Sequence, residues 1–323
     1  MEYKPFGIYI KTHKPHYYLC KVLIASLRYY APWVDITIIP DDNYDDDTIW
    51  GEKVLTSKEP FFHELKYFLG VFRVFFGPYD RFLFIDADQM AIRPLDSLIN
   101  KIKQQEKPFF IADRNKGVVN ILENGSEEDK LKMYNERLGD ITLFEELDPK
   151  FNYKELFPVS GGNFATHKDF ISVDSLKEIV DKAKQVHKNR GLPAINNRRI
   201  GILGRNQGLL NYIIFHQGVK PILVDNFYYW GGGTPSRFNE YLADNKDNIP
   251  YFIHWGGCPK PTFLRRNVPG ADKWIHFYNE YYNNNGSVNM YYIETAKNIK
   301  FDLMKRMRKT RSKIKRKLLD YLK

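Results

Sequence analysis

Residues 81–88 read RFLFIDAD, and this stretch decides the fold class. Its apolar run, residues 82–85, is continuous instead of alternating with polar residues, which is typical of a strand buried on both faces of a parallel sheet. Residues 6–11 are typical of a strand, residues 36–39 are a second short apolar run, and residues 18–30 between them carry apolar side chains at helical spacing. A strand, a helix and a second strand in this order favour an α/β protein with a mainly parallel central sheet.

Two carboxylates, Asp86 and Asp88, follow the buried run directly. Ligands of open α/β sheets bind outside the carboxyl ends of the strands, and spacing i, i+2 on an extended chain places both side chains on the same side. Hard oxygen ligands of this kind select Mg²⁺ or Mn²⁺, which bind through one or two carboxylates together with substrate phosphates. A turn with two solvated aspartates is the alternative interpretation.

A second stretch with the composition of a binding site is YFIHWGGCPK, residues 251–260. It predicts a short strand that runs into a glycine-rich loop. His254 near the strand end is a candidate third ligand, and an imidazole would favour Mn²⁺. The glycines leave the backbone open to a phosphate, and Lys260 adds a positive charge. Cys258 beside His254 suggests zinc, but two further soft ligands are missing.

The composition sets the class of protein. The chain has 323 residues, 43% of them apolar and 15% aromatic, which excludes a disordered chain or a disulfide scaffold. Two cysteines indicate a reducing compartment. Residues 1–10 lack the pattern of a secretory signal, and no run has the length needed to cross a bilayer. We therefore expect a cytoplasmic protein.

The net charge of +10 lies at one end of the chain. Residues 297–323 contain twelve Lys or Arg and two Asp, so the rest of the chain is neutral. The apolar residues of this tail share one helical face: Leu303, Met307, Ile314, Leu318 and Tyr321. A basic amphipathic helix is typical of peripheral attachment to an anionic membrane surface. A solvated charged end is the alternative.

Three motifs together resemble those of glycosyltransferase family 8. The block His254-x-x-Gly257-x-x-Lys260-Pro261 matches the HxxGxxKP signature of that family, and Asp86-x-Asp88 matches its DxD motif. Residues 206–211, NQGLLN, resemble its DQGxLN segment, with Asn206 in the place of the aspartate. The motifs occur in the family's order, within residues 6–262.

The resemblance implies a GT-A-like fold, with a mixed, mainly parallel central sheet flanked by helices. It implies a metal-dependent transfer of a sugar from a nucleotide-diphosphate sugar, with a UDP-sugar as the expected donor, to a glycan or lipid-linked acceptor with retained configuration. The implied metal is Mn²⁺ or Mg²⁺ on Asp86, Asp88 and His254. Such an ion would neutralise the diphosphate as the sugar leaves.

The resemblance also implies roles for single residues. Gln207 is expected near the anomeric carbon, where it would position the sugar or stabilise its charge, since an amide is a poor nucleophile. Asn206 takes the family position linked to acceptor binding or charge stabilisation. The donor contacts, besides those of the two aspartates, are assigned to Lys260, Gly257, Thr12 in the loop after the first strand, and Arg73, with Lys66 as an alternative to Arg73.

We expect the following organisation. Residues 1–265 form the GT-A-like domain, in which residues 113–157 are a helical insertion. Residues 266–296 form an aromatic helical extension, whose aromatic side chains recur at helical spacing and are expected to pack in the core. Residues 297–323 form the basic tail.

Three other classes of protein remain open. A nucleotidyltransferase could use a similar fold, but would be expected to carry a glycine-rich basic loop after its first strand, and residues 11–15 contain no glycine. A protein that binds nucleic acid through the tail would leave Asp86, Asp88, His254 and Lys260 unexplained, so no nucleic-acid partner is expected. A carbohydrate-binding module without activity would need no metal ligands.

Overall fold

The computed structural model describes residues 4–13, 16–40, 53–54, 61–62, 65, 67–195, 201–204 and 206–284, together with residues 296, 299–300, 303–304 and 307. The acidic residues 41–47, Lys66, and most of the basic tail with Ile314, Leu318 and Tyr321 lie outside the described residues.

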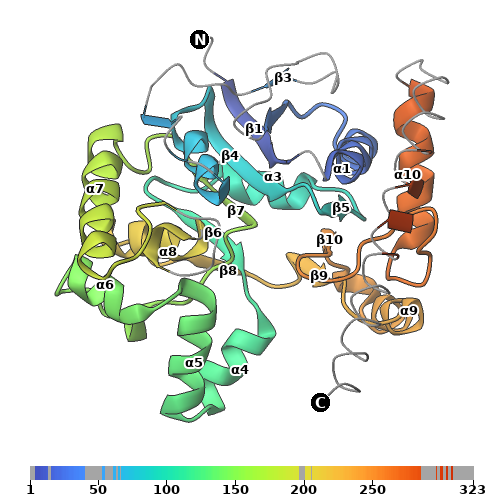
Figure 1. Cartoon of the computed structure of the whole chain (residues 1–323). Helices are drawn as coiled ribbons and strands as arrows, with labels where there is room; N and C mark the ends of the chain where they lie inside the picture. The colour runs from blue at the N-terminus through green and yellow to red at the C-terminus, as the bar shows by residue number, and fades with distance from the viewer. Residues whose placement is uncertain are drawn as a thin grey trace.

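A seven-stranded sheet forms the centre of the described chain (Figure 1). In spatial order its strands are β3 (Lys53–Val54), β2 (Ile36–Ile39), β1 (Lys4–Lys11), β4 (Tyr79–Asp86), β7 (Asn163–His167), β6 (Phe110–Asp113) and β8 (Ile222–Val224). All neighbours are parallel except that β7 runs antiparallel to β4 and β6. The mixed, mainly parallel sheet predicted from the sequence is confirmed.

A small second sheet lies beside the large one. It consists of β5 (Gln89–Ala91), β10 (Phe252–His254) and β9 (Tyr228–Trp230) in that order. β10 pairs antiparallel with β5 and parallel with β9. Because β5 follows β4 after a two-residue turn, the small sheet begins at the carboxyl edge of the large one.

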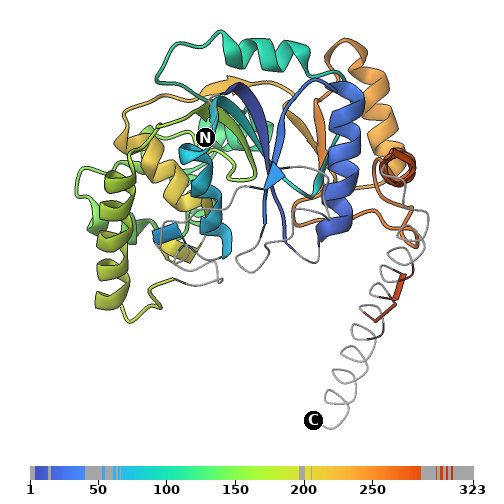
Figure 2. The ribbon, with the colours of Figure 1, turned by 90° about the horizontal axis from the view of Figure 1, so that it is seen from above.

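Helices cover both faces of the large sheet (Figure 2). Their bounds are α1 (Tyr17–Tyr30), the 3₁₀ helix η3 (Tyr67–Phe76), α3 (Asp96–Lys103), α4 (Lys116–Asn124), α5 (Glu127–Leu138), α6 (Ile141–Leu147), α7 (Val173–Asn189), α8 (Asn206–His216), α9 (Pro235–Asp244) and α10 (Ala271–Asn284). Short 3₁₀ turns cover Tyr153–Glu155, Ile202–Gly204 and Lys246–Asn248. The residues of the predicted insertion include α4, α5 and α6.

The apolar run of β4 explains the two-layered core. Phe82 and Phe84 belong to the hydrophobic cluster on one face, which includes residues of η3, α7 and α8. Leu83 and Ile85 belong to the cluster on the other face, which includes residues of α1, α3 and α10. All four side chains are fully buried. Both faces of the strand are therefore covered, as the continuous apolar run predicts.

The aromatic residues of α10 pack into the core. Trp274, Phe277 and Tyr278 are buried against α1, which confirms the prediction of core packing for them. Lys21 of α1 is buried there as well, and its ammonium donates to the Tyr282 hydroxyl at 3.0 Å. In the described part of the chain, no helix combines the length and apolarity that a bilayer crossing requires.

Two glycines directly before β7 approach other elements closely. A Cβ on Gly161 would lie 2.9 Å from the side chain of Asn206, and one on Gly162 would lie 2.7 Å from Asp86. This segment is a tight link between β4 and α8.

Candidate functional site

Asp86 is placed by the end of β4. It is the last residue of that strand, and Lys11 at the end of β1 is its partner in the parallel register. The backbone N–H of Asp86 donates to the Gly162 carbonyl oxygen at 2.8 Å, and that of Ala87 donates to the Lys11 carbonyl oxygen at 2.9 Å. The carboxylate therefore lies at the carboxyl edge of the sheet, where ligands of open α/β sheets bind.

Asp88 and His254 are brought together by the small sheet. Gln89 of β5 pairs with His254 of β10, and the backbone N–H of Trp255 donates to the Asp88 carbonyl oxygen at 3.0 Å. The imidazole Nε2 lies 3.3 Å from Asp88 Oδ1. His254 is 6% exposed and Asp88 is 8% exposed. The two side chains thus meet in a largely desolvated position.

Asp86, Asp88 and His254 form a candidate metal site. One ligand atom from each of the three lies within 4.8 Å of the other two. In addition, His254 Nδ1 is buried and has no hydrogen-bond partner among the described residues. Two carboxylates and one imidazole are a donor set that suits Mn²⁺, and the carboxylates also suit Mg²⁺. The residues present therefore fit the divalent cation expected from the sequence.

The surroundings of the two aspartates shift their pKa values in opposite directions. Burial alone would raise the pKa of Asp88, but the hydrogen bonds and charges of His254 and Lys260 hold it below its ordinary value. Burial and the nearby Asp88 charge raise the pKa of Asp86 well above its ordinary value, against the opposing charges of Lys11 and Lys260. Two carboxylates this close favour either a proton on one of them or a cation between them.

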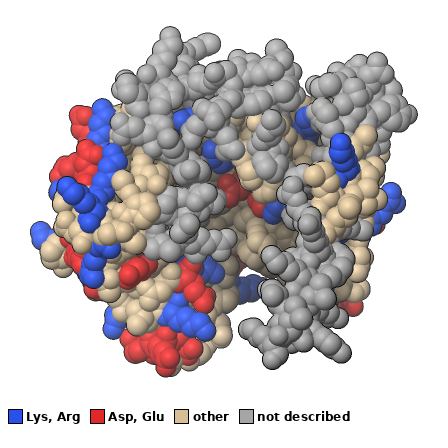
Figure 3. Space-filling model, viewed as in Figure 1, with Lys and Arg blue, Asp and Glu red and all other residues tan. Residues whose placement is uncertain are grey.

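Lys260 lies directly over the acidic pair. Its ammonium donates to Asp88 Oδ2 at 2.7 Å and to the Trp255 carbonyl oxygen at 3.0 Å. Arg265 steadies the loop by donating to the Lys260 carbonyl oxygen at 3.2 Å. Figure 3 shows acidic and basic side chains side by side near the centre of the face seen in Figure 1. The lysine predicted to hold a phosphate is therefore at the predicted metal site.

The local geometry of the loop explains why positions 256 and 257 are glycines. A Cβ on Gly256 would lie 2.6 Å from His254 Nε2, so a side chain there would displace the imidazole. Gly257 has a φ of +71°, a conformation that other residues rarely adopt. The spacing of the His-Gly-Lys motif thus follows from a tight turn that returns Lys260 to Asp88.

The start of α8 lies next to the acidic pair. Asn206 Nδ2 donates to the Gly161 carbonyl oxygen at 2.8 Å. The adjacent Gly162 carbonyl oxygen accepts from the Asp86 backbone N–H and, at 3.0 Å, from Gln89 Nε2. Hydrogen bonds to the carbonyl oxygens of Gly161 and Gly162 therefore link Asn206 to Asp86.

Several buried polar atoms around this link have no hydrogen-bond partner among the described residues. They are Gln207 Nε2 and both amide atoms of Asn163, the first residue of β7. Buried polar groups of proteins are normally hydrogen-bonded, so such atoms are available to a ligand. By contrast, the side-chain amide of Asn211 is hydrogen-bonded through both its oxygen and its nitrogen. It accepts from Val159 N and donates to Val159 O and Gln207 O. Asn211 therefore anchors α8, whereas Gln207 keeps a free donor in the described structure.

Thr12 and Arg73 are predicted from the sequence to contact the nucleotide-sugar donor. Thr12 follows Lys11, its backbone N–H donates to Ile39 O at 3.0 Å, and its buried hydroxyl has no partner among the described residues. Arg73 is buried in η3 and donates to the Phe62 carbonyl oxygen at 2.8 Å. The donor-binding roles of Thr12 and Arg73 stay predictions.

Two further residues contact the site. Lys11, which the sequence analysis did not single out, lowers the pKa of Asp86 by its charge, and its ammonium donates to the Pro40 carbonyl oxygen at 3.3 Å. Tyr228 packs its ring edge-on against the His254 imidazole, with ring centroids 5.1 Å apart. Tyr228 belongs to the aromatic residues 228–230 before three glycines, for which the sequence allows either stacking on a sugar or a buried turn. Its contact with His254 depends on the pairing of β9 with β10 and is not visible in the sequence.

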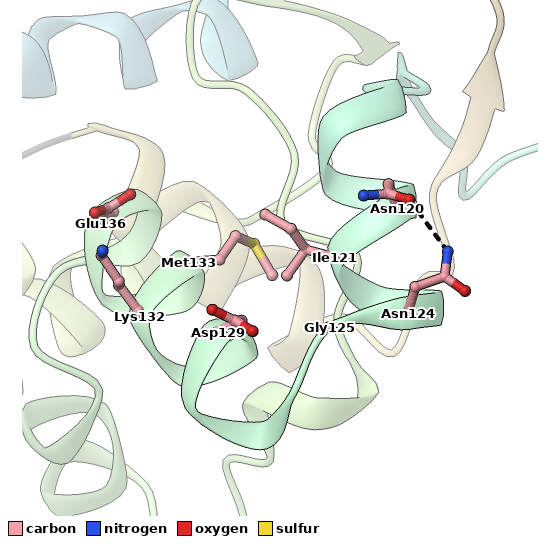
Figure 4. A pocket seen from close by; sticks show the side chains of 8 residues that line it. All are labelled: Asn120, Ile121, Asn124, Gly125, Asp129, Lys132, Met133 and Glu136. Atoms are coloured by element: carbon pink, nitrogen blue, oxygen red, sulfur yellow. Dashed lines mark hydrogen bonds between the residues drawn. The ribbon is translucent and has the colours of Figure 1, made fainter.

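A separate cavity of about 370 Å³ lies between α4 and α5 (Figure 4). Its walls include Asn120, Asn124, Lys132 and Glu136. The two asparagine side chains are hydrogen-bonded to each other at 3.1 Å. None of the residues predicted from the sequence to bind a donor or a metal lines this cavity, so it is distinct from the candidate site.

Comparison with known proteins gave matches of structure alone. No protein-family model and no curated protein matched the chain by sequence. The bifunctional glycosyltransferase WbbM matches 85% of this chain and 50% of its own, with 14% identity and a TM-score of 0.49. The glycosyltransferase GlyE of Streptococcus pneumoniae TIGR4 matches 85% of this chain and 60% of its own, with 11% identity and a TM-score of 0.48.

A third structure is that of the galactosyltransferase LgtC in complex with donor and acceptor sugar analogues. It matches 84% of this chain and 95% of its own, with 12% identity and a TM-score of 0.48. This chain thus spans only about half to three fifths of the length of WbbM and GlyE. All three structures are glycosyltransferases, the class that the motifs also resemble. At these identities and TM-scores, we base the functional proposal on the site residues.

Proposed function

We propose that the protein is a metal-dependent glycosyltransferase that moves a sugar from a nucleotide-diphosphate sugar to a glycan or lipid-linked acceptor, with retention of configuration. The observation that supports this most directly is the convergence of Asp86, Asp88 and His254 within 4.8 Å. These residues come from two different sheets, and Lys260 adds a phosphate-binding charge to them.

Several groups of the chain are suited to hold a diphosphate. When bound, a divalent cation supplies positive charge against the diphosphate leaving group. Lys260 carries a second positive charge, and the backbone around Gly257 is free of side chains that would block a phosphate. Lys11 adds a third charge close enough to act on Asp86. A UDP-sugar is the donor we propose, with Thr12 and Arg73 as further donor contacts.

Gln207 and Asn206 are proposed to act on the sugar. Gln207 keeps a buried amide donor that no described residue uses, and it stands at the start of α8, next to residues 161–162. We assign to it the positioning of the sugar and the stabilisation of the positive charge at its anomeric carbon. Asn206 is already bonded to Gly161, so its role is to hold the wall of the sugar site.

The test is thermal unfolding of the full chain with UDP and UDP-sugars, each with and without Mn²⁺. Binding to the native state alone raises the melting temperature by mass action. We expect UDP with Mn²⁺ to raise it and neither component to reach the same effect alone. Product analysis then separates the enzyme classes, because sugar transfer releases UDP whereas nucleotidyl transfer releases pyrophosphate. Release of pyrophosphate from a nucleoside triphosphate would refute the proposal.

We also propose that the basic tail attaches the enzyme to the cytoplasmic surface of an anionic membrane. Leu303, Met304 and Met307 are 48%, 44% and 70% exposed, so their apolar side chains are available to lipid. Anionic vesicles should carry the full chain, but not a chain that ends at Ile299, to the top of a flotation gradient. Equal recovery of the two chains would contradict the attachment through the tail.

A further inference from the structure

We propose that Trp230 is a stacking platform for a sugar ring of the acceptor. This inference rests on the proposed function and adds to it a residue that determines which acceptor is bound. Trp230 is the last residue of β9 and is 50% exposed. It lies beside the candidate metal ligand His254, with ring centroids 5.9 Å apart.

Trp230 lies across β10 from the strand that follows the acidic pair. In the small sheet, β10 lies between β5 and β9, so His254 has Gln89 as its partner on one side and Trp230 on the other. Asp88 precedes Gln89, so the acidic pair adjoins β10 on the β5 side and Trp230 adjoins it on the β9 side. A sugar ring stacked on the indole would therefore lie beside His254, next to the proposed reaction site.

The indole is held in place. The backbone N–H of Gly231 donates to the His254 carbonyl oxygen at 2.7 Å, which fixes the chain directly after Trp230. A Cβ on Gly232 would lie 2.9 Å from the indole ring, so only glycine lets the backbone pack against it. A hydrogen bond joins Trp230 to the thiol of Cys258 in the phosphate-binding loop. A rigid aromatic side chain binds with little loss of conformational entropy.

The chemistry of the exposed indole favours a sugar. One face of a pyranose ring is made of C–H groups, which pack on an aromatic plane, while its hydroxyl groups remain free for hydrogen bonds. The buried aromatic residues of α10 cannot serve in this way. Trp33 is equally exposed, at 53%, but it precedes β2 and therefore lies at the opposite edge of the sheet. Among these tryptophans, Trp230 is the one beside the proposed reaction site.

The test uses the full chain loaded with UDP and Mn²⁺ on an array of immobilised glycans. Four proteins are compared: the parent chain, Trp230→Ala, Trp230→Phe and the matched control Trp33→Ala. We expect the parent and Trp33→Ala to bind the same class of glycan and Trp230→Ala to bind it about tenfold more weakly, the loss expected for one stacked ring. Trp230→Phe should keep most of the binding. UDP binding, measured by thermal shift, should be equal in all four.

The outcomes separate this inference from the proposed function. Equal glycan binding by Trp230→Ala and the parent overturns the platform. So does a parent chain that binds UDP and Mn²⁺ but no glycan. Loss of UDP binding in Trp230→Ala overturns it as well, because the indole would then belong to the donor site. A parent chain that binds neither UDP nor Mn²⁺ refutes the proposed function itself.

Discussion

Asp88→Asn should remove most of the stabilisation of the protein by Mn²⁺ while the chain still folds. At a Mn²⁺ concentration of 100 times the Kd, binding stabilises the native state by about 2.7 kcal/mol. One kcal/mol shifts the melting temperature of a chain of about 150–250 residues by about 2–4 °C, and a longer chain by somewhat less, so we expect a rise of about 5 °C for the parent. Removing one of two carboxylate ligands should weaken binding about 100-fold, which reduces the rise to about 1 °C.

Asp88→Asn should also lower the stability of the metal-free protein. The Lys260 ammonium loses its ionic acceptor, which costs about 1.5–3 kcal/mol, and relief of the repulsion from Asp86 offsets part of this. The protein therefore melts earlier but cooperatively. Asp80→Asn is the matched control, because Asp80 is also 8% exposed, lies near the start of β4, away from the acidic pair, and is paired with Lys107 and Arg81. It should lose stability and keep the full response to Mn²⁺.

The assay is differential scanning fluorimetry of both variants and the parent in EDTA and in increasing Mn²⁺. The assignment of Asp88 as a metal ligand is refuted if Asp88→Asn keeps the parent's rise in melting temperature. It is equally refuted if Asp80→Asn loses that rise, because the effect would then follow general stability instead of the metal ligands.

Three further predictions concern the surroundings of the metal site. Gly162→Ala should weaken Mn²⁺ binding in the same fluorimetric titration and lower the free energy of unfolding by about 1–3 kcal/mol, because its Cβ would lie 2.7 Å from Asp86 Oδ2. Burial raises the pKa of Asp113 to about 7, so this carboxyl should reduce the stability of the protein as the pH rises from about 4 through 7. Asp113→Asn should therefore remove about 2–3 kcal/mol of the stability difference that urea unfolding measures between pH 5 and pH 8. Gln207→Ala should lower kcat about 10²–10³-fold with little change in the KM of the donor, as initial rates would show.

The sequence predicts those parts of this protein that follow from local patterns. The continuous run before Asp86 predicts a strand covered on both faces, and the two core clusters confirm it. The strand end of β4 predicts where the acidic residues lie, and the structure places Asp86 and Asp88 at the carboxyl edge. His254 and Lys260 were grouped with them because they follow a second short strand and its glycine-rich loop, and the structure brings both to Asp88.

The rest of the site depends on contacts between distant segments. Gly162 matters because its carbonyl oxygen accepts from Asp86 and because no side chain fits beside that carboxylate, and neither fact is local to the sequence around Gly162. Tyr228 and Trp230 reach His254 only because β9 pairs with β10 in one particular register. A shift of one residue would point each side chain to the other face of the small sheet. The aromatic residues 228–230 can be noticed in the sequence as a candidate sugar-stacking segment, but their place beside His254 is known only from the strand pairing.

The electrostatics of the site suggest why it joins two sheets. Asp86 belongs to the large sheet and His254 to the small one. The backbone hydrogen bond from Trp255 N–H to the Asp88 carbonyl oxygen joins the chain segments that carry them. The raised pKa of Asp86 shows that its ionised form is unfavourable in this arrangement. A fold that holds two carboxylates close together before the ligand arrives carries a repulsion that a cation relieves on binding. The free energy of metal binding is therefore expected to include the relief of this repulsion, besides the ligand bonds themselves.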